Sequence, residues 1–316
     1  MNDKAKLAVL AALAIALIGI FLFTDLAGNL EYVLSRRCKK VWAIALTGAT
    51  VAFATTVFQT LVNNRILTPS IIGLDSLYML LQTTVVFLFG GFALTSMNRE
   101  VRFLLSAGLM VLFAGLLYRL LFRAHERDLY MVLLVGIVCG VFFQSIASFM
   151  QKLMDPNEFL IVQDRMFASL NHPDTDVLLI ATALAAFSVL ACARNFKYLD
   201  AIALGRDHAI NLGVPYERAI RHLFLLVAAL IAAATALAGP ITFLGLLVAN
   251  IAHQWIHTYR HRFRLAGSML LGVIALVGGQ LVVERVFTFS TTLSVIINFV
   301  GGVYFLYLLL RENRRW

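Results

Sequence analysis

The chain of 316 residues contains few charged side chains and only three cysteines. Charged residues make up 14% of the sequence and hydrophobic residues 61%, whereas an ordinary soluble domain is roughly a quarter charged. This excess of apolar surface excludes a typical soluble fold and favours a membrane protein. Cys38, Cys139 and Cys192 lie far apart and have no paired metal or redox spacing, so we expect them to be packing residues.

Two further absences restrict the energy source of any activity. The sequence has no G-x-x-x-x-G-K-[ST] loop to bind nucleotide phosphates, so hydrolysis of ATP would have to take place on a partner. We expect no carboxylate in the middle of an apolar run, with Asp75 and Glu284 coming nearest to the hydrocarbon. Because ion-coupled carriers usually keep an ionisable residue inside the membrane, a secondary transporter is the less favoured alternative.

Apolar runs recur along the whole chain and are separated only by short polar stretches. Crossing about 30 Å of hydrocarbon takes about 20 helical residues, and the runs lack the alternating pattern of barrel strands. The expected spans are 7–23, 41–62, 71–94, 103–121, 129–149, 177–195, 220–238, 241–257, 265–283 and 293–310. The sequence therefore predicts an all-α polytopic membrane protein with about ten transmembrane helices, in which residues 1–316 form one domain.

The basic residues set the expected orientation of these spans. Most of the 26 lysine and arginine residues fall on the cytoplasmic side if both termini are cytoplasmic, as the positive-inside rule requires. The net charge of +9 thus reflects contact with membrane lipid, and we expect no nucleic acid partner. A basic cluster on the outer side departs from the rule; it consists of Arg36, Arg37, Lys39 and Lys40.

Two connections are longer than the others. Residues 150–176 contain the turn signal Asp155-Pro156 followed by apolar residues at helical spacing, which predicts a short interfacial helix on the periplasmic side. Residues 196–219 contain Gly205, Gly213 and Pro215, which predict two short helices on the cytoplasmic side.

Polar residues within the apolar runs are candidates for a transport pathway. Gln59 and Asn64 lie at the end of the second span and Pro69 lies just before the third, where they could line a narrowing or could support close helix packing. His253, His257 and His261 are spaced so that one helical face could carry all three and bind a metal ion. The neighbouring arginines oppose cation capture, so we expect no metal site, and no group of residues suggests catalysis.

Two motifs provide a family resemblance. Residues 204–214 read L-G-R-D-H-A-I-N-L-G-V and residues 238–246 read A-G-P-I-T-F-L-G-L; with one span between them, they resemble the FecCD permeases. These proteins are the membrane subunits of ABC importers for siderophores, haem and vitamin B12. Gly48 and Gln59 match a further family segment. Residues 155–170 and 242–250 are most similar to the branch for catecholate siderophores such as vibriobactin, anguibactin and petrobactin, with haem and cobalamin as alternative cargoes.

The resemblance also implies partners and residue roles. A periplasmic siderophore-binding protein would dock on Arg37, Lys40 and Arg285. A cassette ATPase dimer, which binds ATP and magnesium, would contact a coupling segment made of Gly205, Arg206, Asp207, His208, Asn211 and Gly213. A cytoplasmic gate, formed with a second permease subunit, would involve Gln59, Asn64, Ile66 and Pro69. The implied activity is import of a ferric siderophore across the inner membrane by alternating access, without catalysis or a cofactor on this chain.

Overall fold

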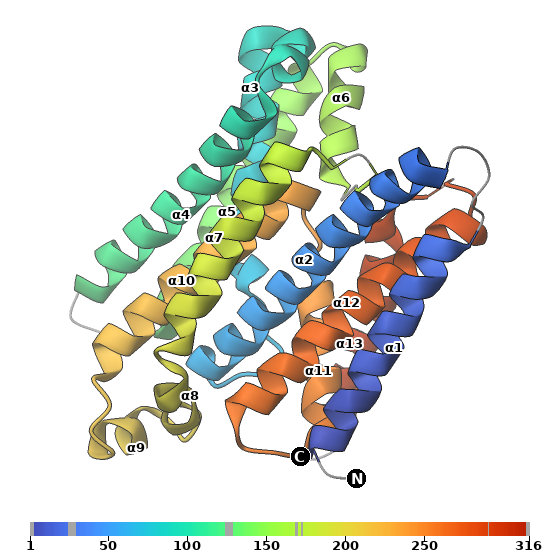
Figure 1. Cartoon of the computed structure of the whole chain (residues 1–316). Helices are drawn as coiled ribbons and strands as arrows, with labels where there is room; N and C mark the ends of the chain where they lie inside the picture. Colours follow the sequence, from blue (N-terminus) through green and yellow to red (C-terminus); the bar gives the residue numbers. More distant parts are fainter. Residues whose placement is uncertain are drawn as a thin grey trace.

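The computed structural model describes residues 3–24, 30–123, 129–167, 170–171, 173–289 and 291–313. Over these ranges the chain is helical and contains no β-strand. The helices pack into an elongated bundle (Figure 1). The longer ones are α1 (Asp3–Phe23), α2 (Leu30–Val62), α3 (Leu74–Ser96), α4 (Arg99–Arg123), α5 (Leu129–Leu153), α7 (Thr175–Ala193), α10 (Tyr216–Ala238), α12 (His261–Arg285) and α13 (Leu293–Asn313). The shorter ones are η1 (Pro69–Ile72), α6 (Pro156–Met166), α8 (Phe196–Ile202), α9 (Arg206–Asn211) and α11 (Leu244–Trp255).

Eight of the described helices are long and apolar enough to cross a membrane, and α13 adds a shorter apolar stretch, Leu293–Leu308. The predicted span 241–257 is wrong as a complete crossing. Its helix, α11, has 12 residues and therefore rises only about 18 Å. The apolar stretch is not one continuous helix because the chain is interrupted just before α11. Gly239 takes a φ of 94° there, and Pro240 has no backbone N–H to donate to a helix. The chain turns there inside the bundle.

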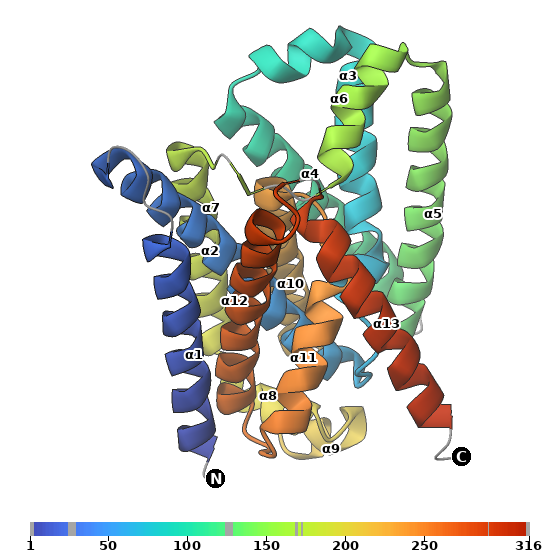
Figure 2. The ribbon, with the colours of Figure 1, turned by 90° about the vertical axis from the view of Figure 1, so that its right-hand side faces the viewer.

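The two longer connections lie at opposite ends of the bundle. Helix α6 occupies one end, whereas α8 and α9 lie at the other, together with the start of α1 and the end of α13 (Figure 2). The short helix predicted within 150–176 is confirmed; Asp155 caps it by accepting a hydrogen bond from the Asn157 backbone N–H. The two short helices predicted within 196–219 are confirmed as α8 and α9.

Helix α2 forms the centre of the bundle. Its most apolar stretch is 78% buried, against 17% for that of α1 at the periphery. Near its middle, α2 crosses α12 at Gly48 and Gly272, where a Cβ atom on Gly48 would lie 2.6 Å from the Gly272 carbonyl oxygen. Two backbones can approach this closely only where both residues lack a side chain. This contact holds the central helix against α12.

Candidate functional site

The basic residues predicted to lie on the outer side gather around a cleft. Arg37, Lys40 and Arg285 line a cleft of about 540 Å³ between α2, α12 and the end of α1, together with Phe21, Tyr32, Val33, Arg36, Asn171, Glu284 and Phe289. The structure thus brings together the three residues predicted to dock a binding protein, although Arg285 is 245 or more residues away from the other two in sequence.

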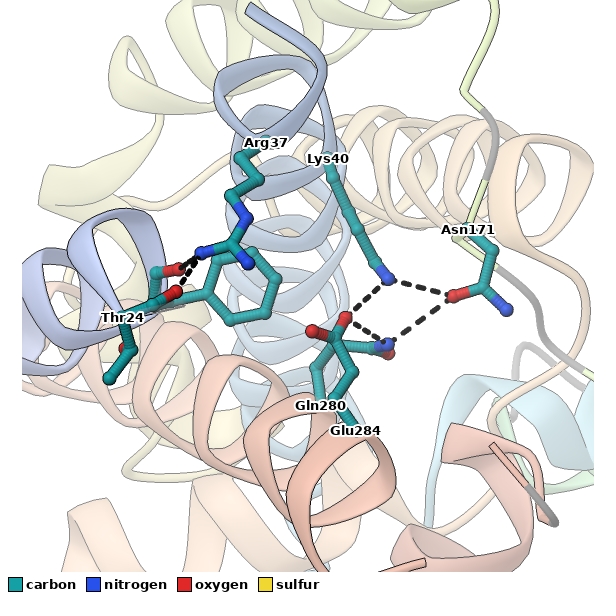
Figure 3. A network of polar contacts seen from close by, with 7 residues as sticks. Thr24, Arg37, Lys40, Asn171, Gln280 and Glu284 are labelled. Carbon is teal, nitrogen blue, oxygen red and sulfur yellow. Dashed lines mark hydrogen bonds and ion pairs between the residues drawn. The ribbon is translucent and has the colours of Figure 1, made fainter. Parts of the chain in front are cut away.

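Lys40 is turned inward and forms part of a closed polar network (Figure 3). Its Nζ atom donates to Glu284 Oε1 at 2.5 Å and to Asn171 Oδ1 at 2.9 Å. Gln280 Nε2 donates to the same two oxygens, at 3.0 and 3.3 Å. Only 8% of Lys40 is exposed, and its ammonium group links α2 to α12. The long aliphatic part of the lysine side chain lets its ammonium group reach Glu284 and Asn171. This inward contact of Lys40 was not predicted from the sequence.

Arg37 and Arg285 both hold the end of α1. The Arg37 guanidinium donates to the Phe21 carbonyl oxygen at 3.0 Å and to the Thr24 carbonyl oxygen. Arg285 donates to the same Thr24 oxygen at 3.2 Å. The last carbonyl groups of a helix have no partner within the helix, so the two arginines satisfy them. Arg285 and Arg36 remain exposed, which keeps positive charge on the surface at this end of the bundle.

The predicted coupling segment is a single exposed surface at the end of the bundle opposite α6. Arg206, Asp207, His208 and Asn211 are all exposed on α9, while buried Ala209 and Val214 anchor the segment on the bundle. Its ends are set by Gly205 and Gly213, whose φ angles are 98° and 78°; such values favour glycine because it lacks a Cβ atom. All six predicted residues therefore lie together.

A buried histidine joins α8, the short helix that precedes this segment, to the bundle. The Asp200 carboxylate on α8 accepts from the His261 backbone N–H at 2.9 Å and lies 2.6 Å from the ring Nδ1. On the opposite side of the ring, Nε2 lies 3.1 Å from Thr60 Oγ1 on α2. His261 is only 2% exposed. One side chain thus connects α8, α12 and the inner end of α2, a role for Asp200 and His261 that the sequence analysis missed.

The turn that follows α2 is held by side-chain amides. Gln59 Nε2 and Asn250 Nδ2 both donate to the Arg65 carbonyl oxygen, at 2.6 and 2.9 Å. Asn64 Oδ1 accepts from the Ile66 backbone N–H at 2.9 Å. Three of the four predicted gate residues, Gln59, Asn64 and Ile66, therefore lie together in or beside this turn. Asn250 was not among the predicted gate residues, although an amide within an apolar run was a signal for it.

Pro69, the fourth predicted gate residue, lies apart from the other three. It begins η1 and is buried, where it lines a separate cavity within the bundle. The pocket of about 130 Å³ beside the turn is lined by Gln59 and Asn64 but not by Pro69. The structure therefore divides the predicted gate into an inner turn and a deeper element.

The three histidines do not share a helical face. Helix α11 ends at Trp255 and α12 begins at His261, so His257 lies in the connection between them. His253 contacts Arg264, and the His257 ring lies 3.4 Å from Lys6 Nζ. No group of three or more His, Cys, Asp or Glu side chains that could hold a metal ion occurs in the part of the chain that the structure describes.

A polytopic helical bundle with a basic cleft at one end and an exposed two-helix segment at the other defines a membrane permease. The FecCD transport family matches residues 13–311, and the chain belongs to that family. It is 54% identical to the petrobactin import system permease protein YclO of Bacillus subtilis over 316 residues, all of both chains. It is 35% identical to the petrobactin import system permease protein FatC of Bacillus anthracis, over 89% of this chain and 79% of that protein.

The fold agrees with that of a solved transporter. A metal-chelate type ABC transporter in an inward-facing conformation superposes with a TM-score of 0.84 at 20% identity, covering 98% of this chain and 99% of that one. The all-α polytopic fold and the family predicted from the sequence are thereby confirmed. Both relatives named above are petrobactin permeases, in agreement with the branch that the motifs indicated.

Proposed function

We propose that this chain is the permease subunit of an ABC importer that carries a ferric catecholate-type siderophore across the cell's inner membrane by alternating access. The observation that carries the proposal is the full-length relationship to a petrobactin import permease. In this proposal α8, α9 and both termini face the cytoplasm, and the basic cleft faces outward. The partners are a second permease subunit, a cassette ATPase dimer and a siderophore-binding protein. ATP and magnesium belong to the ATPase, and this chain performs no catalysis.

Uptake by the reconstituted transporter tests the proposal. Proteoliposomes containing this permease, its partner permease and the cassette ATPase should accumulate iron-loaded petrobactin from the binding protein when ATP is enclosed, and should not do so with ADP. Uptake driven by a proton or sodium gradient without ATPase subunits would instead identify an ion-coupled carrier. ATP-driven uptake of haem or cobalamin, but not of petrobactin, would reassign the cargo.

The outer cleft yields a prediction about docking. Charge reversal in Arg285→Glu should weaken binding of the siderophore-binding protein by about tenfold, because an exposed rim charge steers an oppositely charged partner. The measurement is the affinity of the binding protein for the permease in nanodiscs at low and at high salt. The difference in affinity between the variant and the wild type should be smaller at high salt, because salt screens the charge. Arg262→Glu is the matched control, since Arg262 is exposed at the opposite end of the same helix. Equal losses in both variants would contradict a docking role.

The His261 link yields a prediction about coupling. Asp200→Ala should lower ATP-driven uptake by about tenfold or more, because α8 would lose two hydrogen bonds to α12 and would transmit ATPase motion poorly. The measurement is the number of ATP molecules hydrolysed per siderophore imported, which should rise. Lys197→Ala, an exposed change on the same short helix, is the control. If uptake and hydrolysis fell in parallel, with their ratio unchanged, Asp200 would be structural only.

A further inference from the structure

A small polar cavity lies inside the bundle, away from both ends. Its volume is about 10 Å³ for a water-sized sphere, which is room for one water molecule or one small cation. Six segments of chain converge on it, from α2, the start of η1, the first turn of α3, the end of α10, the turn after α10 and the start of α11. Its polar lining consists of Thr47, Thr55, Thr68, Ser70, Asp75, Thr235 and Thr242.

The cavity lies at the middle depth of the bundle. Thr47 precedes Gly48, whose backbone meets Gly272 near the middle of both α2 and α12. Asp75 lines the same cavity as Thr47, so its carboxylate lies level with the middle of α2. In the sequence, Asp75 opens its apolar run, and in the structure it lies in the first turn of α3. However, η1 returns into the bundle before α3 begins. Gly73, at the junction of η1 and α3, packs so closely on α5 that a Cβ atom on Gly73 would lie 2.9 Å from Gly140 Cα.

Two residues of this lining carry a buried oxygen atom that has no hydrogen-bond partner among the described residues. These atoms are Asp75 Oδ2 and Thr47 Oγ1. The other carboxylate oxygen of Asp75 accepts from Thr235 Oγ1, at a long 3.3 Å. Buried polar atoms in native proteins almost always have a partner, and leaving one without a partner costs roughly 1–3 kcal/mol. Because the two residues that carry these atoms line one small cavity, a single bound group there could supply the missing partner of both.

Among the described residues that line the cavity with Asp75 there is no lysine, arginine or histidine. An isolated carboxylate is expensive to bury unless it is paired or binds an ion, and ionisable residues at membrane depth usually mark an ion site or a proton relay. In its ionised form Asp75 would carry a single negative charge, and every polar side chain of the lining offers oxygen.

We propose that Asp75 and the hydroxyl groups of Thr47, Ser70 and Thr235 bind one monovalent cation of the size of sodium. One carboxylate balances one positive charge, whereas a divalent ion would remain uncompensated. The lining offers neither sulfur nor imidazole, the ligands that transition metals prefer, and hydroxyl and carboxylate oxygens suit hard cations. The ion would join two places where the helices are interrupted, before α3 and after α10, as in other membrane proteins whose broken helices meet at an ion.

The proposed cation site does not depend on the identity of the cargo. Thermal unfolding of the purified full chain in detergent tests it. Tryptophan fluorescence would report the unfolding midpoint as sodium chloride replaces choline chloride at constant ionic strength. Binding to the folded state alone raises the midpoint in a saturable way. We expect such a rise with sodium, a smaller one with potassium and none in Asp75→Asn. Asp164→Asn, which changes an exposed carboxylate on α6, should respond like the wild type.

A second pair of variants keeps the test decisive if Asp75→Asn fails to fold. Thr47→Val removes one proposed ligand and should raise the half-saturating sodium concentration by about tenfold, the effect of losing one bond to a charged group. Thr50→Val is its control, because Thr50 is also buried on α2 but does not line the cavity. The same midpoint in sodium, potassium and choline would overturn the proposal and leave only a water molecule or a proton at Asp75. An unchanged sodium response in Asp75→Asn or Thr47→Val would overturn it as well.

Discussion

Replacing Gly272 with leucine is expected to prevent the permease from folding. At the crossing of α2 and α12, a Cβ atom on Gly272 would collide with the Gly48 carbonyl oxygen, and the atoms in the way are backbone atoms that cannot rotate aside. Overpacking usually costs about 1–3 kcal/mol, and here the central helix itself would be displaced, so we expect at least the upper value. The yield of monodisperse protein in size-exclusion chromatography after detergent extraction measures the effect, and it should fall by about tenfold or more.

Gly278→Leu is the matched control on the same helix. A Cβ atom at Gly278 would meet nothing within 4 Å, so the added side chain should be accommodated and the yield should stay near that of the wild type. If both variants were extracted equally well, or lost equally, the close approach at Gly48 would not be what holds α2 and α12 together.

Removing the carboxylate of the outer network should produce the second largest effect. In Glu284→Leu, the Lys40 ammonium would stay buried without its anionic partner, whose Oε1 atom lies 2.5 Å away in the native protein. Breaking a buried pair from one side costs roughly 3–5 kcal/mol. Because the two side chains are still 10% and 16% exposed, we expect the lower end of that range, measured as a lower thermal unfolding midpoint in detergent.

The double variant Lys40→Met/Glu284→Leu distinguishes pairing from packing. It removes both charges together, so a large part of the lost stability should return, and the coupling energy of the double-mutant cycle should exceed about 1 kcal/mol. The exposed ion pair between Arg99 and Asp174, with an N–O distance of 3.3 Å, offers the comparison. Arg99→Met should cost less than about 1 kcal/mol, as is usual for surface pairs. Additive effects in the cycle would show that Lys40 and Glu284 stabilise the fold independently.

The sequence predicted those features that depend on local patterns. Apolar runs located the long helices, and the glycines at 205 and 213 marked the ends of α9 because a positive φ angle there favours glycine. Hydropathy could not show that α11 is a partial crossing, because residues 241–257 are apolar whether or not all of them are helical. For the same reason, the prediction that one helical face could carry His253, His257 and His261 was wrong. It assumed a continuous helix, whereas α11 ends at Trp255 and α12 begins at His261.

The contacts that complete each site depend on residues far apart in the chain. Lys40 and Glu284 are 244 residues apart, and His261 and Asp200 are 61 apart. Nothing in the neighbourhood of either residue shows the other, so the basic cluster could be located but the inward turn of Lys40 could not be foreseen. The position of Asp75 level with the middle of α2 is a related case, because the return of η1 into the bundle is fixed by its packing on α5.

The uninterrupted course of α2 through the bundle has a mechanical consequence. Its 33 residues form a rod about 50 Å long, with the basic cleft at one end, the turn at Arg65 at the other and the tight contact at Gly48 between them. Such a helix would tilt as a rigid body about its close contact with α12 at Gly48. A tilt of about 10° would move its ends by roughly 4 Å in opposite directions, so narrowing one mouth of the protein and widening the other would be a single displacement.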